Sequence, residues 1–216
     1  AVSKIGKTII PLNKDLKENQ ILDQISYISP DIIIYSKSFK SVVRKVKKKI
    51  FINTKDVFKN TKYKNKKEFN KKNYLDKNFI ITFSSGTTSK PKPIVFTQRI
   101  KHERFKHIKR LYNVKKTDVI LTSSPLDHSL GLRMFFLAIL SGCNLIYFNK
   151  YNLQTWCKII KKNKVSFTIL PSNYLKLLKK DILCKKLRIK KIVSAASDIG
   201  RSDKLALKSK VDFNEM

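Results

Sequence analysis

Acidic residues are scarce in this sequence: 15 of its 216 residues are Asp or Glu, against 48 that are Lys or Arg, and the formal net charge is +33. Only seven of the basic residues are arginine, the side chain that binds phosphates and guanine through a planar fork. The lysines are spread along the whole chain and mixed with Asn and Ile. We therefore interpret the charge mainly as a compositional bias toward Lys, Asn and Ile. A basic nucleic-acid-binding module is the alternative.

Long apolar runs are also missing. The longest mostly apolar, uncharged stretch covers residues 134–148, and Ser141, Gly142 and Asn144 interrupt it. A helix that spans a bilayer needs about 20 apolar residues, so no transmembrane helix is predicted. The N-terminal sequence, AVSKIGKTIIPLN, has no sustained apolar segment and no small-residue cleavage site, so no signal peptide is predicted either.

Cysteine is rare. The sequence has three cysteines, an odd number without the spacing of a metal site: Cys143, Cys157 and Cys184. We expect reduced, partly buried thiols in a cytoplasmic protein. The hydrophobic fraction of 42% is enough to form a sizeable core at this length, so the chain is expected to fold.

Short β-branched runs alternate with amphipathic stretches along the chain. The predicted strands cover residues 32–35, 79–83, 94–96, 119–122, 145–148, 166–170 and 192–195. The predicted helices cover residues 16–28, 98–111, 132–140, 153–162, 174–180 and 203–209, and residues 42–52 are predicted as a helix that turns into a strand. This alternation predicts the α/β fold class, with parallel or mixed sheets flanked by helices. Right-handed crossovers would place the loops that follow the strands at one sheet edge, where ligands bind.

Residues 53–78 interrupt this alternation. They are rich in Lys and Asn, have no usable periodicity, and contain the isolated aromatic residues Phe58, Tyr63, Phe69 and Tyr74. We interpret them as a solvated, mobile loop. The alternative is a surface on which aromatic rings stack with single-stranded nucleic acid, although no RNA-binding signature accompanies them.

Hydroxyl groups, a glycine and a lysine are concentrated in residues 83–92, FSSGTTSKPK, directly after a predicted strand. Gly86 permits a positive φ, which lets neighbouring backbone N–H groups converge on an anion, and Lys92 would add a positive charge. Neutral hydrogen-bond donors would come from four side chains: Ser84, Ser85, Thr87 and Thr88. The segment predicts a phosphate-binding loop, and an ordinary Ser/Thr-rich hairpin loop is the alternative.

The string SSGTTSKPK resembles the phosphate-binding loop of adenylate-forming enzymes, the superfamily of acyl-CoA synthetases, peptide-synthetase adenylation domains and luciferases. Four more segments resemble motifs of this family and occur in the family's order: residues 1–13, 124–132, 165–178 and 192–199. Ser89 and Pro93 stand where the family has glycine, and both restrict the backbone. A catalytically degenerate member of the family is therefore a further alternative.

The resemblance implies that residues 1–216 are an internal piece of the family's large N-terminal domain, without the small C-terminal domain. The family joins a small carboxylic acid to ATP, forms an acyl-adenylate and pyrophosphate, and commonly passes the acyl group to coenzyme A or to the pantetheine of an acyl carrier protein. The residues implied to hold the β- and γ-phosphates of ATP are Ser84, Ser85, Gly86, Thr87, Thr88 and Lys92. Magnesium is implied as well, but its glutamate ligand would follow residue 216. No metal ligand is therefore assigned, and the fragment alone is expected to be inactive.

By the same resemblance, His128 corresponds to a histidine at the mouth of the acyl pocket, near the carboxylate and the α-phosphate. A half-buried structural histidine that caps a loop is the alternative. Asp127 could orient the imidazole, but neighbours on an extended segment are expected to point apart. Residues 130–140 either line an acyl tunnel or form plain core. His102, on the predicted basic helix, is expected on the solvated surface.

Overall fold

The computed structural model describes residues 2–47, 49–59, 75–84, 91–148, 151–178, 187–195, 200–208 and 211–215. The strands are β1 (Ile32–Tyr35), β2 (Ile50–Asn53), β3 (Asn78–Phe83), β4 (Pro93–Thr97), β5 (Val119–Thr122), β6 (Asn144–Tyr147), β7 (Phe167–Pro171), β8 (Leu187–Ala195) and β9 (Val211–Glu215). The α-helices are α1 (Glu18–Ile28), α2 (Lys40–Arg44), α3 (Thr54–Lys59), α4 (Gln98–Tyr112), α5 (Ser129–Ser141), α6 (Leu153–Asn163), α7 (Ser172–Leu178) and α8 (Arg201–Lys208). Two short 3-10 helices cover Val2–Ile5 and Lys37–Phe39.

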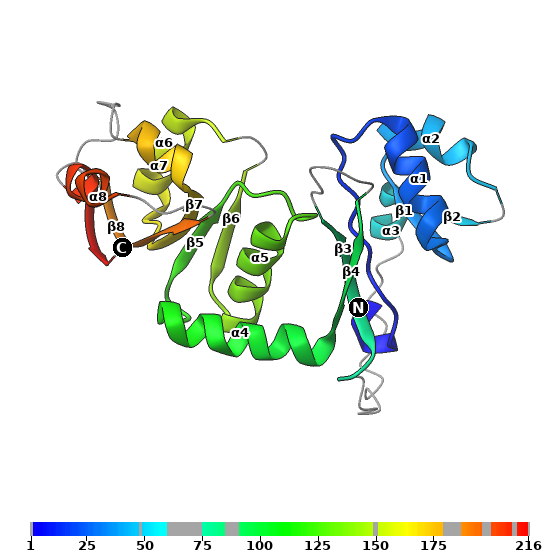
Figure 1. Cartoon of the computed structure of the whole chain (residues 1–216), viewed down its shortest axis with the longest axis horizontal. Coiled ribbons are helices and arrows are strands. Elements are labelled where there is room, and N and C mark those ends of the chain that lie inside the picture. Colours follow the sequence, from blue (N-terminus) through cyan, green and yellow to red (C-terminus); the bar gives the residue numbers. More distant parts are fainter. Residues whose placement is uncertain are drawn as a thin grey trace.

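Within these ranges the strands form three sheets. The largest is parallel, with the strand order β6-β5-β7-β8-β9, while β1 pairs with β2 in parallel and β3 pairs with β4 antiparallel. In Figure 1 the β1–β2 unit and its helices lie at one end of the molecule and the five-stranded sheet at the other, with the β3–β4 hairpin, α4 and α5 between them. The fold is therefore α/β with parallel sheets and flanking helices, as the sequence predicts.

The five-stranded sheet is covered by helices on both faces because alternate side chains of its central strands point in opposite directions. On one face, Ile120 of β5 and Phe167 of β7 pack with Met134 of α5 in one core cluster. On the other face, Leu121 of β5 belongs to a second cluster, together with Trp156 of α6. All five side chains are almost fully buried.

A buried carboxylate joins the amino ends of three strands of this sheet. Asp118, immediately before β5, accepts hydrogen bonds from the backbone N–H of Lys115 (2.7 Å) and from Ser166 Oγ (2.8 Å), next to β7. Lys190 of β8 brings its Nζ to 3.4 Å from the same carboxylate. Because these contacts align the strands at one end, the opposite, carboxyl ends form a common edge.

The segment predicted as a loop over residues 53–78 begins instead with a helix. The Oδ1 atom of Asn53 accepts a hydrogen bond from the backbone N–H of Lys55 at 3.0 Å, which satisfies a free donor of the first turn of α3. The loop prediction is therefore wrong for Thr54–Lys59. Residues 60–74, which include three of the four isolated aromatic residues, lie outside the described residues.

Strand β8 is longer than the sequence indicates, and β9 was not predicted. Two neighbouring lysines, Lys190 and Lys191, follow the apolar positions Leu187 and Ile189 and obscure the alternation in the first half of β8. Both lysines find acceptors in the fold: Lys190 Nζ lies near Asp118, and Lys191 Nζ donates to the carbonyl oxygen of Tyr112 at 3.4 Å. These partners are distant in sequence, so a pattern confined to the strand could not reveal them.

The cysteines differ from the expectation of reduced thiols. Cys143 is a free, half-buried thiol, and burial is the main reason why its pKa is raised. Cys157 is buried and disulfide-bonded, so the expectation is wrong for this residue. Disulfide pairing requires a close approach in space, which the spacing of cysteines along a chain does not show. In the part of the chain that the structure describes, no helix is both long enough and apolar enough to span a membrane.

Candidate functional site

The predicted phosphate-binding loop connects the two strands of the β3–β4 hairpin. Phe83 is paired with Pro93 in the antiparallel register, and beyond this pair Ser84 and Lys92 hold the two ends of the loop together. The backbone N–H of Ser84 donates to the carbonyl oxygen of Lys92 (2.9 Å), and the backbone N–H of Lys92 donates to Ser84 Oγ (3.1 Å). The Lys92 side chain is exposed. Four predicted site residues lie outside the described residues: Ser85, Gly86, Thr87 and Thr88.

The two hydrogen bonds with Lys92 give Ser84 a structural role that its sequence position alone does not indicate. Its hydroxyl accepts the Lys92 N–H, and a hydroxyl can accept and donate at the same time, so this bond leaves its capacity to donate. The loop is closed at its base, and the lysine starts from a fixed backbone position.

His128 lies at the amino end of α5, after the loop that follows β5. Its backbone N–H donates to the carbonyl oxygen of Pro125 (3.1 Å), and its own carbonyl oxygen accepts from Leu132 N–H (3.0 Å). The imidazole makes no capping hydrogen bond to the helix, and 52% of its side-chain surface is exposed. The backbone is therefore fixed while the imidazole remains accessible. In Figure 1 the carboxyl ends of β5 and β3 both lie at the upper side of the view.

Asp127 lies closer to His128 than the sequence suggests. Its Oδ2 is 3.6 Å from His128 Nε2, and only 16% of the Asp127 side chain is exposed. The expectation that the two side chains point apart is wrong because residues 126–128 form a turn rather than an extended strand.

Gly131 is the residue that sequence reasoning overlooked in this loop. A Cβ atom on Gly131 would lie 2.0 Å from the carbonyl oxygen of Pro125 and 2.6 Å from that of Ser124. The first turn of α5 therefore packs directly on the backbone of the loop that carries His128, an approach that only glycine permits. A glycine inside an otherwise apolar helical stretch was the available signal.

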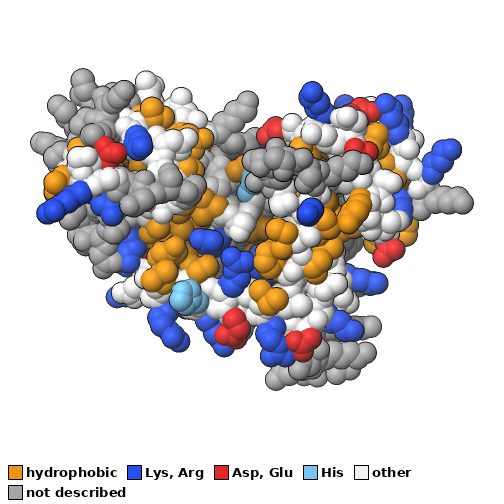
Figure 2. Space-filling model, in the orientation of Figure 1, with side chains coloured by type: hydrophobic (Ala, Val, Ile, Leu, Met, Phe, Trp, Pro, Cys, Tyr) orange, Lys and Arg blue, Asp and Glu red, His pale blue; other side chains and the backbone are white. Residues whose placement is uncertain are grey.

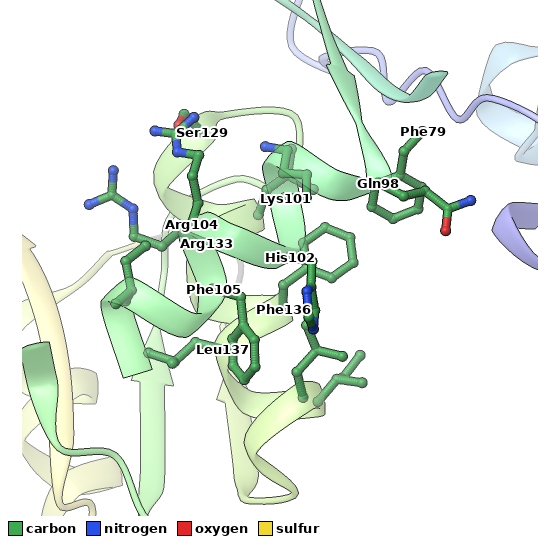
Figure 3. A pocket seen from close by; sticks show the side chains of 14 residues that line it. Phe79, Gln98, Lys101, His102, Arg104, Phe105, Ser129, Arg133, Phe136 and Leu137 are labelled. Atoms are coloured by element: carbon green, nitrogen blue, oxygen red, sulfur yellow. The ribbon is translucent and has the colours of Figure 1, made fainter. Parts of the chain in front are cut away.

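A cavity of about 480 Å³ lies between α4, α5 and the start of β3. Figure 3 shows the side chains that line it. Most are apolar, among them Phe79, Phe105, Leu132, Phe136, Leu137 and Leu140. Its lining residues on α5 run from Ser129, next to His128, to Leu140, a distance of about 16 Å along the helix axis. The cavity wall thus starts at the residue that follows His128, and His128 itself is not among the described lining residues.

Helix α5 forms core and lines the cavity at the same time, so the core interpretation holds for part of residues 130–140, and the acyl tunnel stays a prediction. Met134 and Ala138 are buried in the core cluster on the sheet. Phe136, Ile139 and Leu140 instead face the cavity. The helical period turns these two sets in different directions.

Basic side chains also line the cavity: Lys101 and Arg104 from α4, and Arg133 from α5. The pKa of Lys101 is lowered to about 8, mainly by burial and further by the positive charges of Arg104 and Arg133. His102 was expected on the solvated surface; its side chain is 49% exposed, yet it contributes to the cavity wall. Figure 2 shows Lys and Arg side chains in the hollow between two hydrophobic areas.

Comparison with protein families matches residues 1–211 to the family described as AMP-binding enzyme. The chain belongs to the AMP-binding enzyme family. The resemblance stated from the loop motif is thereby confirmed at the level of the family. A comparison with curated proteins finds no match.

Solved structures of adenylate-forming enzymes share the fold of this AMP-binding chain. The inhibitor-bound N-terminal domain of FACL13 from Mycobacterium tuberculosis has a TM-score of 0.87 at 17% identity, over 99% of this chain and 57% of that one. A red-emitting luciferase from Phrixothrix hirtus has a TM-score of 0.83 at 20% identity, over 97% and 45%. O-succinylbenzoate coenzyme A synthetase (MenE) from Bacillus subtilis, in complex with AMP, has a TM-score of 0.80 at 17% identity, over 99% and 54%. The chain spans about half the length of these proteins.

Among the described residues, no group of three or more His, Cys, Asp or Glu side chains is placed to hold a metal ion.

Proposed function

We propose that this chain is part of the N-terminal domain of an enzyme that activates a carboxylic acid with ATP, forming an acyl-adenylate and releasing pyrophosphate. The observation that supports this most directly is the apolar cavity that begins beside His128. A mostly apolar cavity with basic and polar groups in its wall suits a carboxylic acid whose carbon skeleton is buried and whose carboxylate remains at the mouth.

In the proposed reaction a carboxylate oxygen attacks the α-phosphorus of ATP. A new oxygen–phosphorus bond forms, and the bond between the α-phosphorus and the bridging oxygen of the β-phosphate breaks. The electron pair leaves with pyrophosphate. Because negative charge accumulates on the phosphates, catalysis depends mostly on positioning and on electrostatic stabilisation.

The hairpin loop supplies this stabilisation in our proposal. Lys92 provides a positive charge for the β- and γ-phosphates, and the hydroxyl and N–H groups of the loop provide neutral donors: Ser84, Ser85, Gly86, Thr87 and Thr88. The two hydrogen bonds between Ser84 and Lys92 favour this function, because a loop closed at its base needs less reorganisation when the phosphates bind. Bound magnesium would neutralise further phosphate charge.

His128 is proposed to contact the carboxylate and the α-phosphate at the mouth of the cavity. Its exposed imidazole and fixed backbone suit this position, and the carboxylate of Asp127 lies 3.6 Å from its Nε2 atom. Gly131 would act through His128, because its close packing on Pro125 fixes the loop.

A thiol is the proposed acceptor of the acyl group in a second step. The thiol gives up its proton to solvent, and its sulfur forms a thioester bond with the acyl carbon. The bond between the acyl carbon and the phosphate oxygen breaks, and AMP leaves with that oxygen and its electron pair. The thiol would belong to coenzyme A or to the pantetheine of an acyl carrier protein. We propose that the reaction takes place in the cytoplasm and involves no specific nucleic acid.

The proposal is tested by carboxylate-dependent exchange of pyrophosphate into ATP, measured with the full-length protein. We expect exchange in the unmodified protein and a decrease of about 10- to 100-fold in Lys92→Ala. The loss of one charge-assisted contact of about 1.5 to 3 kcal/mol gives a decrease of this size. Lys158→Ala, on the exposed side of α6, is the matched control and should leave exchange unchanged.

Unchanged exchange in Lys92→Ala would contradict the role of the loop. If the unmodified protein is well folded but catalyses no pyrophosphate exchange with any carboxylic acid tested, it is a degenerate family member. That result would be explained by Ser89 and Pro93, which replace the two glycines of the usual loop.

A further inference from the structure

Three basic side chains face the cavity, and no described Asp or Glu residue forms an ion pair with them. Lys101 and Arg104 lie three residues apart on one face of α4, and Arg133 comes from α5. Among the described residues that line the cavity, none is Asp or Glu. Glu103, the acidic residue of α4, lies instead 3.2 Å from Lys106 and 3.6 Å from His102.

These three charges are close enough to act on one another. The positive charges of Arg104 and Arg133 both contribute to the lowered pKa of Lys101. The nearest compensation that the structure offers is an aromatic ring: Lys101 Nζ lies 3.8 Å, and Arg104 Cζ 5.5 Å, from the centre of Phe96. A cation–π contact is weaker than an ion pair with a bound anion and leaves the mutual repulsion in place.

The cavity therefore combines two chemical characters. In Figure 3, Lys101, Arg104 and Arg133 lie toward the end of the cavity at Ser129, and Phe105 and Leu137 lie toward the other end. An occupant that matches both has an anionic group beside an apolar part. Perturbed basic groups that gather in a cavity are typical of ligand sites.

We propose that Lys101, Arg104 and Arg133 bind a second anionic group, a carboxylate or a phosphate, of a molecule that occupies the cavity. This group is additional to the carboxylate that is activated, so the inference rests on the proposed function and specifies its ligands further. The group has two possible sources: a second acidic group on the carboxylic acid, or a phosphate on the thiol acceptor. Lys92 is not among the described residues that line the cavity.

Binding is tested first, because it does not depend on catalysis. The full-length protein is titrated calorimetrically with matched pairs of acids: butanedioate with butanoate, hexanedioate with hexanoate, and decanedioate with decanoate. For a substrate-borne group, we expect at least one diacid to bind about tenfold more tightly than its monoacid. This preference should disappear in Arg104→Gln/Arg133→Gln, which keeps side-chain length and removes two charges. Arg110→Gln, also on α4 but not in the cavity wall, is the control and should keep the preference.

The second source is tested with thioester formation. If the cluster binds a phosphate of the acceptor, the double variant should raise the KM for coenzyme A about tenfold. Its KM for pantetheine, which has no phosphate, should not change.

The proposal is overturned if the double variant changes neither the diacid preference nor the KM for coenzyme A. Failure of the proposed function gives a different result: no exchange with any acid, whatever the calorimetry shows. Diacid binding that depends on the two arginines would support the anion site even then.

Discussion

Because Gly131 packs against the loop that carries His128, we predict that replacing it with alanine lowers the free energy of unfolding. In Gly131→Ala the new Cβ would lie 2.0 Å from Pro125 O. Separations under 3.0 Å are essentially never seen, so loop and helix must separate by about 1 Å. Overpacking of this kind costs about 1 to 3 kcal/mol, and the better helix propensity of alanine offsets up to about 1 kcal/mol. We expect a net destabilisation of about 1 to 2 kcal/mol.

Urea unfolding measures this effect directly. With a slope of about 2 kcal/mol per molar, the midpoint should fall by about 0.5 to 1 M. Gly200→Ala is the matched control, because the nearest atom to its new Cβ is the Ser202 hydroxyl oxygen at 4.0 Å, and its midpoint should barely change. In the full-length protein, Gly131→Ala should also reduce pyrophosphate exchange by up to about a hundredfold, because His128 is displaced. A midpoint equal to that of Gly200→Ala, or higher than that of the unmodified protein, would refute the reasoning.

Two further predictions concern buried or partly buried charges. Asp118→Ala should lower the free energy of unfolding by about 2 to 4 kcal/mol, because it leaves the Lys115 N–H and the Ser166 hydroxyl without their acceptor. Urea unfolding measures this change. Asp23→Ala, on the surface of α1, is the control. Diacid binding should weaken as the pH rises from 7 to 9, because Lys101, with a pKa of about 8, loses the charge that attracts the anion. Arg104 and Arg133 keep their charges over this range. Diacid binding is measured in a His102→Gln background, which removes the histidine from the cavity wall. If binding still weakens with rising pH when Lys101→Gln is added, the role assigned to the Lys101 charge is wrong.

Much of the fold could be predicted from the sequence because its signals are local. Strands β1 and β5 have the predicted bounds, since short β-branched runs bounded by polar residues specify strands without reference to the rest of the chain, although no residue of β1 is buried. The hairpin loop was also recognisable, because its glycine, hydroxyls and lysine are adjacent in sequence.

The predictions failed where distant partners decide the structure. The first half of β8 carries Lys190, which is compatible with a central strand only because Asp118 lies beside it. The contact between Asp127 and His128 depends on a turn that the sequence did not reveal.

The sequence by itself determined the family, the α/β class and the position of the loop in the chain, because each depends on residues that are close together along the chain. Only the tertiary structure decided that α4 and α5 enclose a cavity beside His128, and that Lys101 and Arg104 meet Arg133 there. Helix crossing brings together side chains from separate segments, and no periodicity within one helix specifies which residues of another it will face.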